Sequence, residues 1–302
     1  MEVWSLEGHD ERVTSVAFSS DSSLIASVSC DKTIKIWDSA TSKHVQTLVG
    51  HCKQVTLVAF SNNSQFIASG SDDMTVKIWE IATGREVWTF KDHCDGVLSV
   101  AYSSDMKFVA SGSNDGTIKI WDTTEGQEVW TLEGHDDGVL SVAFSNDSKR
   151  LASGSIDETI KIWDVDEATL IRTLTHSDAL FSVAFSGDSE TIASGSADCN
   201  VKIRDTDTST NVQMLEGHGG PVHSVALSSD SKLVASGSSD CTINIWDAVT
   251  GREKHTLKGH DKDAISVTFS NDSKRIASAS YDTTVKIWNA VEGTEVRTLK
   301  DP

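Results

Sequence analysis

The sequence predicts an all-β protein built from seven copies of one small antiparallel sheet, arranged radially. The first observation is a histidine that recurs along the 302 residues at steps of 42, 42, 42, 41, 42 and 42. Repetition with a period of about 40–45 residues is typical of repeat architectures. The second observation is that each copy contains four short β-patterned segments and no helical period. We therefore expect a single domain over residues 1–302. The repeated histidines are His9, His51, His93, His135, His176, His218 and His260.

The first copy shows the expected strands in order. Residues 13–19 form a short β-branched run, and the polar turn 19–23 (SSDSS) separates this run from an apolar segment at 24–29. A tight turn then leads to residues 33–37 (TIKIW), which alternate apolar and polar side chains as a strand does. A fourth strand follows a polar loop, as in residues 128–132 (EVWTL), and ends at the next Gly-His pair.

Composition restricts the compartment and the class of partner. A net charge of −19 without a basic stripe argues against nucleic acid. The chain has no signal peptide and no apolar run near 18 residues, so we expect a cytoplasmic protein without a membrane segment. Five cysteines without CxxC spacing indicate a reducing compartment, and we expect neither metal nor cofactor. In six of the seven copies one lysine is predicted to point outward from the third strand, at Lys35, Lys77, Lys119, Lys161, Lys202 and Lys286.

Four phrases recur in register through residues 6–289: Gly-His, Ser-Val-Ala-Phe-Ser, Ala-Ser-Gly-Ser-x-Asp and Ile-Trp-Asp. They make the chain resemble the WD40-repeat family. The resemblance implies a seven-bladed β-propeller with four antiparallel strands per blade, no catalytic activity, and binding of other proteins or peptides. Phrases such as FSNDSK and TIKIWD are also similar to the C-terminal WD40 arrays of fungal NACHT–WD receptors of the vegetative-incompatibility type. That narrower likeness implies the ligand-sensing part of a larger receptor.

The chain has one more fourth-strand segment than seven blades need. The first such segment is residues 2–6 (EVWSL) and the last is residues 295–299 (EVRTL). An open sheet edge favours unwanted association, so one of the two must complete the last blade. Because propellers of the family that the chain resembles usually close with the N-terminal strand, we predict that residues 2–6 pair beside residues 284–288.

The resemblance also implies a hydrogen-bonded chain of His, Ser, Asp and Trp inside each blade. A buried indole N–H needs an acceptor, and a hydroxyl can accept from it while donating to an imidazole. Leu57 replaces the serine in the second copy, and Arg204 replaces the tryptophan in the fifth, so these two blades are predicted to be incomplete. The five complete sets are predicted to be His9, Ser15, Asp31 and Trp37; His93, Ser99, Asp115 and Trp121; His135, Ser141, Asp157 and Trp163; His218, Ser224, Asp240 and Trp246; and His260, Ser266, Asp282 and Trp288.

A Ser-His-Asp set is also the pattern of a hydrolytic triad. Five complete copies, each with a tryptophan attached, favour a structural role instead. No HExxH, GxSxG or paired-carboxylate pattern stands outside the repeats. We therefore predict that the chain is not an enzyme.

Differences between the copies predict the binding surface. The residues beside the repeated aspartate and near the start of the first strand vary, whereas turns such as SSDSS keep one pattern. In the implied propeller the varying positions lie on one face, and apolar side chains among them are not what a solvated face prefers. Drift on an exposed surface is the alternative explanation. We call this predicted protein-binding surface the variable face, and its residues are Arg12, Thr14, Lys32, Asp72, Leu98, Asn114, Leu140, Ile156, Phe181, His223, Ser239, Ile265 and Tyr281.

Two functions fit these observations. One is the ligand-sensing domain of a larger signalling receptor, and the other is a constitutive scaffold for assembling a protein complex. The chain contains no GxxxxGK[ST] nucleotide-binding loop. In either case we expect a domain that is monomeric when isolated and that binds a protein or peptide, with no nucleic acid and no membrane.

Overall fold

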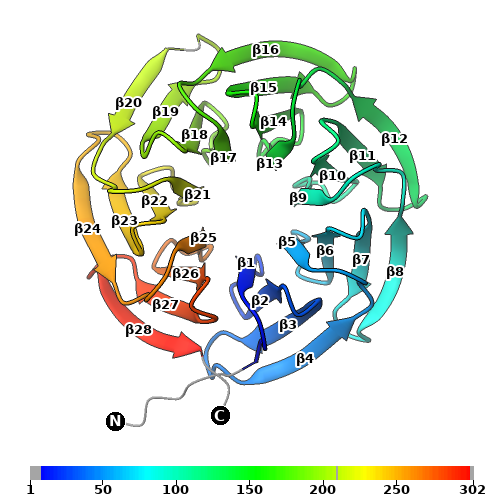
Figure 1. The fold of residues 1–302 in the computed structure, drawn as a ribbon, viewed down its shortest axis with the longest axis horizontal. Helices are drawn as coiled ribbons and strands as arrows, with labels where there is room; N and C mark the ends of the chain where they lie inside the picture. Colours follow the sequence, from blue (N-terminus) through cyan, green and yellow to red (C-terminus); the bar gives the residue numbers. More distant parts are fainter. Residues whose placement is uncertain (1–7, 209, 300–302) are drawn as a thin grey trace.

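The computed structural model describes residues 8–208 and 210–299, which form a ring of seven four-stranded antiparallel sheets (Figure 1). Each sheet contains four strands that follow one another along the chain, ordered from the centre to the rim. The predicted fold class, a seven-bladed β-propeller with four antiparallel strands per blade, is confirmed.

The strands occupy four concentric positions. The innermost strands are β1 (Val13–Phe18), β5 (Val55–Phe60), β9 (Val97–Tyr102), β13 (Val139–Phe144), β17 (Leu180–Phe185), β21 (Val222–Leu227) and β25 (Ala264–Phe269). The second strands are β2 (Leu24–Ser29), β6 (Phe66–Ser71), β10 (Phe108–Ser113), β14 (Arg150–Ser155), β18 (Thr191–Ser196), β22 (Leu233–Ser238) and β26 (Arg275–Ser280). The third strands are β3 (Thr33–Asp38), β7 (Val76–Glu80), β11 (Ile118–Asp122), β15 (Thr159–Asp164), β19 (Val201–Asp205), β23 (Thr242–Asp247) and β27 (Val285–Asn289). The outermost strands are β4 (His44–Val49), β8 (Arg85–Phe90), β12 (Gln127–Leu132), β16 (Thr169–Thr175), β20 (Asn211–Leu215), β24 (Glu253–Lys258) and β28 (Thr294–Leu299).

The core lies between neighbouring blades. Every residue after the first is buried in each second strand, because both of its faces are covered. The small residues of the Ala-Ser-Gly-Ser phrase allow the next blade to approach closely. A Cβ on Gly112 would lie 2.7 Å from Val139 Cγ1 and 3.1 Å from Val142 Cγ1. Close packing between blades is therefore the reason for this phrase.

The last blade is completed by its own fourth strand, so the predicted closure was wrong. Strand β28 pairs with β27, with Val285 opposite Leu299 and Asn289 opposite Thr294. Residues 2–6, which were predicted to fill that place, lie outside the described residues. The ring is joined by contacts between blades instead, and the backbone N–H of Val16 donates to Ser266 Oγ at 3.2 Å.

A side chain on the outermost strand links several blades to the next one. It reaches a carbonyl oxygen in the turn after the third strand of the following blade. The pairs are Trp88 Nε1 with Thr123 O (3.0 Å), Gln213 Nε2 with Val249 O (2.9 Å) and His255 Nε2 with Val291 O (3.0 Å). Arg297 makes the equivalent link across the ring closure, because its guanidinium donates to Ala40 O at 2.6 Å and to Ser42 Oγ at 3.1 Å.

Replacing Arg297 by alanine is expected to lower the free energy of unfolding by about 1 kcal/mol, since two solvent-facing hydrogen bonds across the closure are lost. Chemical denaturation would measure the change. Arg252→Ala is the matched control, because Arg252 is an exposed arginine on the neighbouring outermost turn. Equal stability of the two variants would show that the Arg297 link contributes nothing to closure.

Candidate functional site

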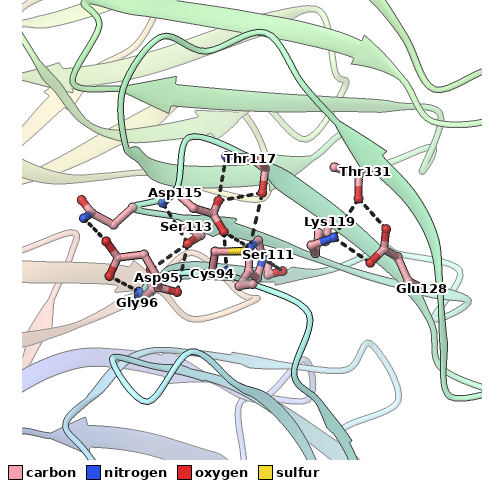
Figure 2. Close-up of polar contacts among 12 residues, drawn as sticks. Cys94, Asp95, Gly96, Ser111, Ser113, Asp115, Thr117, Lys119, Glu128 and Thr131 are labelled. Atoms are coloured by element: carbon pink, nitrogen blue, oxygen red, sulfur yellow. Dashed lines mark hydrogen bonds and ion pairs between the residues drawn. The ribbon is translucent and has the colours of Figure 1, made fainter.

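A hydrogen-bonded chain runs inside the third blade, but its serine is not the predicted one. His93 Nδ1 donates to Asp115 Oδ2 at 3.0 Å, and His93 Nε2 accepts from Ser111 Oγ at 2.7 Å. Figure 2 labels these two partners, Asp115 and Ser111. The indole Nε1 of Trp121 donates to the same hydroxyl at 2.9 Å. Burial lowers the pKa of His93, which keeps the imidazole neutral and suits it to donate at one nitrogen and accept at the other. Ser111 lies on β10, whereas the predicted Ser99 lies on β9.

The same correction applies to every predicted set. The serine that joins histidine and tryptophan comes from the second strand, as Ser27, Ser69, Ser111, Ser153, Ser236 and Ser278. The sequence held the signal for this, because the second-strand serine is present in all seven copies and the first-strand serine in six.

The first-strand serines link blades instead. In four of the five predicted sets the hydroxyl oxygen accepts a backbone N–H from the innermost strand of the next blade. These pairs are Ser99 with Val142 (3.0 Å), Ser141 with Val183 (3.1 Å), Ser224 with Val267 (3.0 Å) and Ser266 with Val16 (3.2 Å). The remaining predicted serine, Ser15, is buried on β1, and the first blade uses Ser27 for its chain.

The second blade is complete, so its predicted defect was wrong. His51 Nδ1 lies 3.0 Å from Asp73 Oδ2, and His51 Nε2 lies 2.8 Å from Ser69 Oγ. Trp79 Nε1 donates to Ser69 Oγ at 2.8 Å. Leu57 therefore replaces a residue that links blades and leaves this chain intact.

The fifth blade is incomplete, as predicted. Arg204 takes the place of the tryptophan, is 7% exposed, and donates to the carbonyl of Thr175 at 2.7 Å. Within the described residues, His176 Nε2 is buried without a hydrogen-bond partner, while the hydroxyl of Ser194 donates to Lys202 O at 3.4 Å. Burial, with the nearby positive charge of Lys202, lowers the pKa of His176 to about 4. This imidazole is thus neutral at physiological pH.

A variant that combines Thr175→Gly and Arg204→Trp is expected to have a higher melting temperature than the wild type, because it completes this hydrogen-bonded chain. Pairing His176 Nε2 should raise the free energy of unfolding by about 1–2 kcal/mol. Thr175 must change as well, because the tryptophan ring packs against the residue before the histidine. A Cβ on Gly134 would lie 3.3 Å from Trp163 Cη2. In five of the six blades with a tryptophan that residue is glycine. Arg204→Trp alone and Thr175→Gly alone are the controls, and a single Arg204→Trp variant as stable as the double would refute the steric argument.

Five of the six lysines of the third strands are buried and Lys35 is half-buried, contrary to the prediction that they point outward. Lys119 is 9% exposed and donates to Glu128 Oε2 at 2.7 Å and to Thr131 Oγ1 at 2.8 Å (Figure 2). The equivalent ion pairs are Lys77 with Glu86 and Lys286 with Glu295. Alternation along the strand correctly placed lysine and isoleucine on opposite faces of the sheet. The lysine stem nevertheless packs inside the blade, where its ammonium group pairs with a carboxylate.

The variable positions lie together on one face, since the loop after each histidine and the turn before each aspartate are hydrogen-bonded to one another. In each of the seven blades a backbone N–H of the turn donates to a carbonyl of the loop. The pairs are Cys30 with Arg12, Asp72 with Gln54, Asn114 with Gly96, Ile156 with Gly138, Ala197 with Ala179, Ser239 with Pro221, and Tyr281 with Asp263, at 3.0–3.2 Å.

Apolar side chains gather on the third to fifth blades of this face. Leu98, Leu140 and Phe181 are half-buried at the start of the innermost strands, and Ile156 is 36% exposed. Leu140 occupies a β-bulge, since the register of β13 shifts between Val139 and Ser141. The bulge lets the strand present one more side chain on this face than a regular ladder would.

A ring contact and a short chain of hydrogen bonds connect the fifth, sixth and seventh blades on this face. The Phe181 and His223 rings lie 5.1 Å apart, and His223 Nε2 contacts Ser239 Oγ at 2.7 Å. The Ser239 hydroxyl donates to Asp263 Oδ2 at 2.8 Å. Burial lowers the pKa of His223, against the opposing effect of Asp263. This group links the sixth and seventh blades at the variable face and holds the face in shape.

The remaining predicted residues of the variable face divide between scaffold and surface. Thr14 is a scaffold residue, because its hydroxyl donates to Val55 O of the next blade at 2.5 Å. Asp72 accepts from Gln54 Nε2 at 2.6 Å. Asn114 donates to Asp95 at 2.8 Å, Lys32 is exposed, and Ile265 is half-buried. Sequence comparison missed Gln54, Asp95 and Asp263 as parts of this surface, although they vary between copies as much as the chosen residues do.

The turns on the opposite face are uniform for a structural reason. The Ser145 hydroxyl donates to Asp147 at 2.6 Å, and Asp147 accepts from the backbone N–H of Lys149 at 3.1 Å. The backbone N–H of Asn146 also donates to Ser189 Oγ of the next blade at 2.9 Å. These bonds require the repeated sequence, so the case for the variable face rests on that face alone.

All five cysteines are free thiols on the variable face or beside it. Among residues 8–208 and 210–299, no group of three or more His, Cys, Asp or Glu side chains is placed to hold a metal ion. No helix capable of crossing a bilayer occurs in that part of the chain.

Comparison with known proteins agrees with this geometry. The family model for the WD domain, G-beta repeat matches seven segments, namely residues 1–38, 42–80, 84–122, 126–164, 168–205, 209–247 and 251–289. The chain is similar to Protein Mut11 of Chlamydomonas reinhardtii, with 50% identity over 42 residues, which are 14% of this chain and 11% of Mut11. The match thus spans about one repeat of this chain and a small part of the relative's length. Since the family matches run through nearly the whole chain and recur once per blade, the chain belongs to the WD40-repeat family.

Proposed function

We propose that this propeller binds a protein or peptide on the variable face and performs no catalysis there. The observation that carries the proposal is the gathering of Leu98, Leu140, Ile156 and Phe181 on three consecutive blades. Exposed apolar side chains also occur on the outermost strands, Trp130, Leu170, Ile171 and Met214 among them, but they are spread around the rim. Apolar anchors surrounded by polar groups are the usual composition of an interface centre.

We further propose that the propeller is the ligand-sensing part of a larger cytoplasmic signalling receptor. The likeness of its phrases to fungal NACHT–WD arrays supports this. A constitutive scaffold is the second candidate, because WD40 propellers are common interaction scaffolds. A ligand that differs between related strains would favour the receptor, and one tight partner present under all conditions would favour the scaffold. The net charge of −19 supports a ligand other than nucleic acid.

Replacing Phe181 and Tyr281 together by serine is expected to weaken partner binding about tenfold or more, as removal of two anchor side chains does. Neither side chain takes part in the His-Ser-Asp-Trp chains, so the melting temperature should change little. Quantitative pull-down from host extract, followed by affinity measurement with the captured partner, would test this.

The matched control is Lys149→Ser with Lys274→Ser, on exposed side chains of the opposite face. Equal loss of binding in the control would move the site to the other face. Unfolding of the Phe181 and Tyr281 variant would show that these side chains belong to the core.

A further inference from the structure

The charged residues of the variable face are unevenly distributed. In the loops after the histidines and the turns around the repeated aspartates, every lysine and arginine lies on the last, first or second blade, as Arg12, Lys32, Lys53 and Lys262. The acidic residues are spread more evenly than the cations. The corresponding loops and turns of the third to fifth blades carry Asp95, Asp136, Asp137, Glu158 and Asp178 without a cation, and those of the last, first and second blades carry Asp10, Glu11, Asp72, Asp261 and Asp263. A chain of net charge −19 therefore places its cations at one side of this face.

An open pocket of about 430 Å³ lies at that side, between the last, first and second blades. We call it the Arg12 pocket, and among its lining residues are Glu11, Arg12, Cys30, Gln54, Lys262 and Tyr281. Arg12 and Tyr281 occur at these positions in one copy each, since the equivalent residues of the other copies differ. The pocket therefore exists at this junction and is not a repeated feature of the propeller.

The guanidinium of Arg12 packs over the Tyr281 ring and forms no ion pair with a carboxylate of the described residues. Its carbon lies 5.0 Å from the centre of the Tyr281 ring, a distance typical of a cation–π contact. Within the described residues, no carboxylate lies within ion-pair distance of Arg12 or Lys262, Glu11 included, and the Arg12 side chain makes no hydrogen bond. Stacking on a ring leaves the in-plane N–H donors of an arginine available to a planar acceptor.

Two polar side chains at or beside the pocket are already engaged. Gln54 accepts from the Cys30 thiol at 3.1 Å and donates to Asp72 at 2.6 Å. The Asp263 carboxylate accepts from Ser239 at 2.8 Å. Arg12 and Lys262 are the cations that line the pocket, together with the Glu11 carboxylate and the Tyr281 side chain.

We propose that the Arg12 pocket receives a carboxylate side chain of the bound peptide, with Arg12 as a bidentate donor and Lys262 as a second cation. This inference rests on the proposed peptide-binding function. A carboxylate matches the planar fork of arginine. A phosphoryl group offers the same acceptor chemistry, but its charge of about −1.5 to −2 meets stronger repulsion from Glu11 and from the acidic side of the face.

A phage-displayed library of random dodecapeptides, selected on the immobilised full chain, tests the proposal. Peptides selected on the wild-type chain should be enriched in aspartate or glutamate, and Arg12→Gln should abolish that enrichment. Lys53→Gln is the matched control, since Lys53 is an exposed cation of the same face that does not line the pocket. Equal melting temperatures would confirm that both variants fold.

A synthetic copy of one selected peptide refines the result. Changing its acid to the amide should weaken binding to the wild-type chain about tenfold and leave binding to Arg12→Gln unchanged, which is the coupling expected of a direct pair. Acidic peptides that bind Arg12→Gln as well as wild type would overturn the pocket while leaving the proposed function intact. A copy of the same peptide with phosphoserine in place of its acidic residue is also measured. Tighter binding of this copy than of the acidic peptide would overturn the carboxylate assignment. A library that yields no binder would overturn the proposed pocket for a peptide carboxylate, whereas the proposed binding function is tested separately by the pull-down with the Phe181 and Tyr281 variant.

Discussion

Replacing Ser153 by alanine is expected to lower the free energy of unfolding by about 2–4 kcal/mol. The Ser153 hydroxyl is fully buried, accepts from Trp163 Nε1 at 2.9 Å, and lies 2.7 Å from His135 Nε2. Alanine leaves both the indole and the imidazole nitrogen without a partner in a site closed to water. Each buried unpaired group costs about 1–3 kcal/mol.

Ser141→Ala is the matched control for Ser153→Ala. Ser141 is a buried serine of the same blade, but its hydroxyl accepts one backbone N–H, that of Val183 at 3.1 Å. The control should lose about 1–2 kcal/mol, because one donor instead of two is affected. Urea denaturation of the two variants would measure the difference. A larger loss for Ser141→Ala would contradict the placement of Ser153 in the hydrogen-bonded chain.

Replacing Asp157 by alanine should be comparably damaging, at about 2–4 kcal/mol, because its carboxylate accepts four hydrogen bonds. The donors are His135 Nδ1 at 2.8 Å, the backbone N–H of Asp136 at 3.1 Å, and the N–H and hydroxyl of Thr159 at 2.9 and 2.6 Å. The aspartate thus joins the histidine loop to the turn, and its loss should loosen both. Asp136→Ala is the control, since the Asp136 carboxylate is exposed.

The loss in Asp157→Ala should depend on pH in a defined direction. Burial alone would raise the pKa of Asp157, but hydrogen bonds from Thr159 and His135 outweigh burial and hold the pKa below its usual range. A carboxyl group whose pKa is lowered by folding stabilises the protein fully above its unfolded pKa, about 3.9, and this stabilisation is lost as pH falls toward the folded pKa. The gap in melting temperature between wild type and Asp157→Ala should therefore be full at pH 7 and smaller at pH 3.5. An equal or larger gap at pH 3.5 would contradict this.

Local features of the sequence were sufficient for the architecture. The 42-residue step, the β-alternation of segments such as TIKIW, and the turns around the aspartates act within a few residues of one another. Seven copies of the pattern make chance agreement implausible. The number of blades and their four strands could be predicted for that reason. The roles of histidine, aspartate and tryptophan, and with them the defect at Arg204, were implied by the resemblance to the WD40 family.

Contacts between repeats could be decided only by the tertiary structure. Two serines recur with the same period, one in all seven copies and the other in six, and their spacing alone does not tell which one faces the histidine and which faces the next blade. Ser111 and Ser99 were separated only when β10 and β9 were placed. The burial of Lys119 depends on Glu128 across the blade, and the strand that closes the ring depends on how β28 meets β27. The Arg12 pocket joins residues 12 and 281, from opposite ends of the chain, which no local pattern relates.

The sequence by itself thus determined the repeated unit, because that unit is made of short-range interactions. The tertiary structure decided how units meet, because each such contact depends on side chains about 42 or more than 200 residues apart.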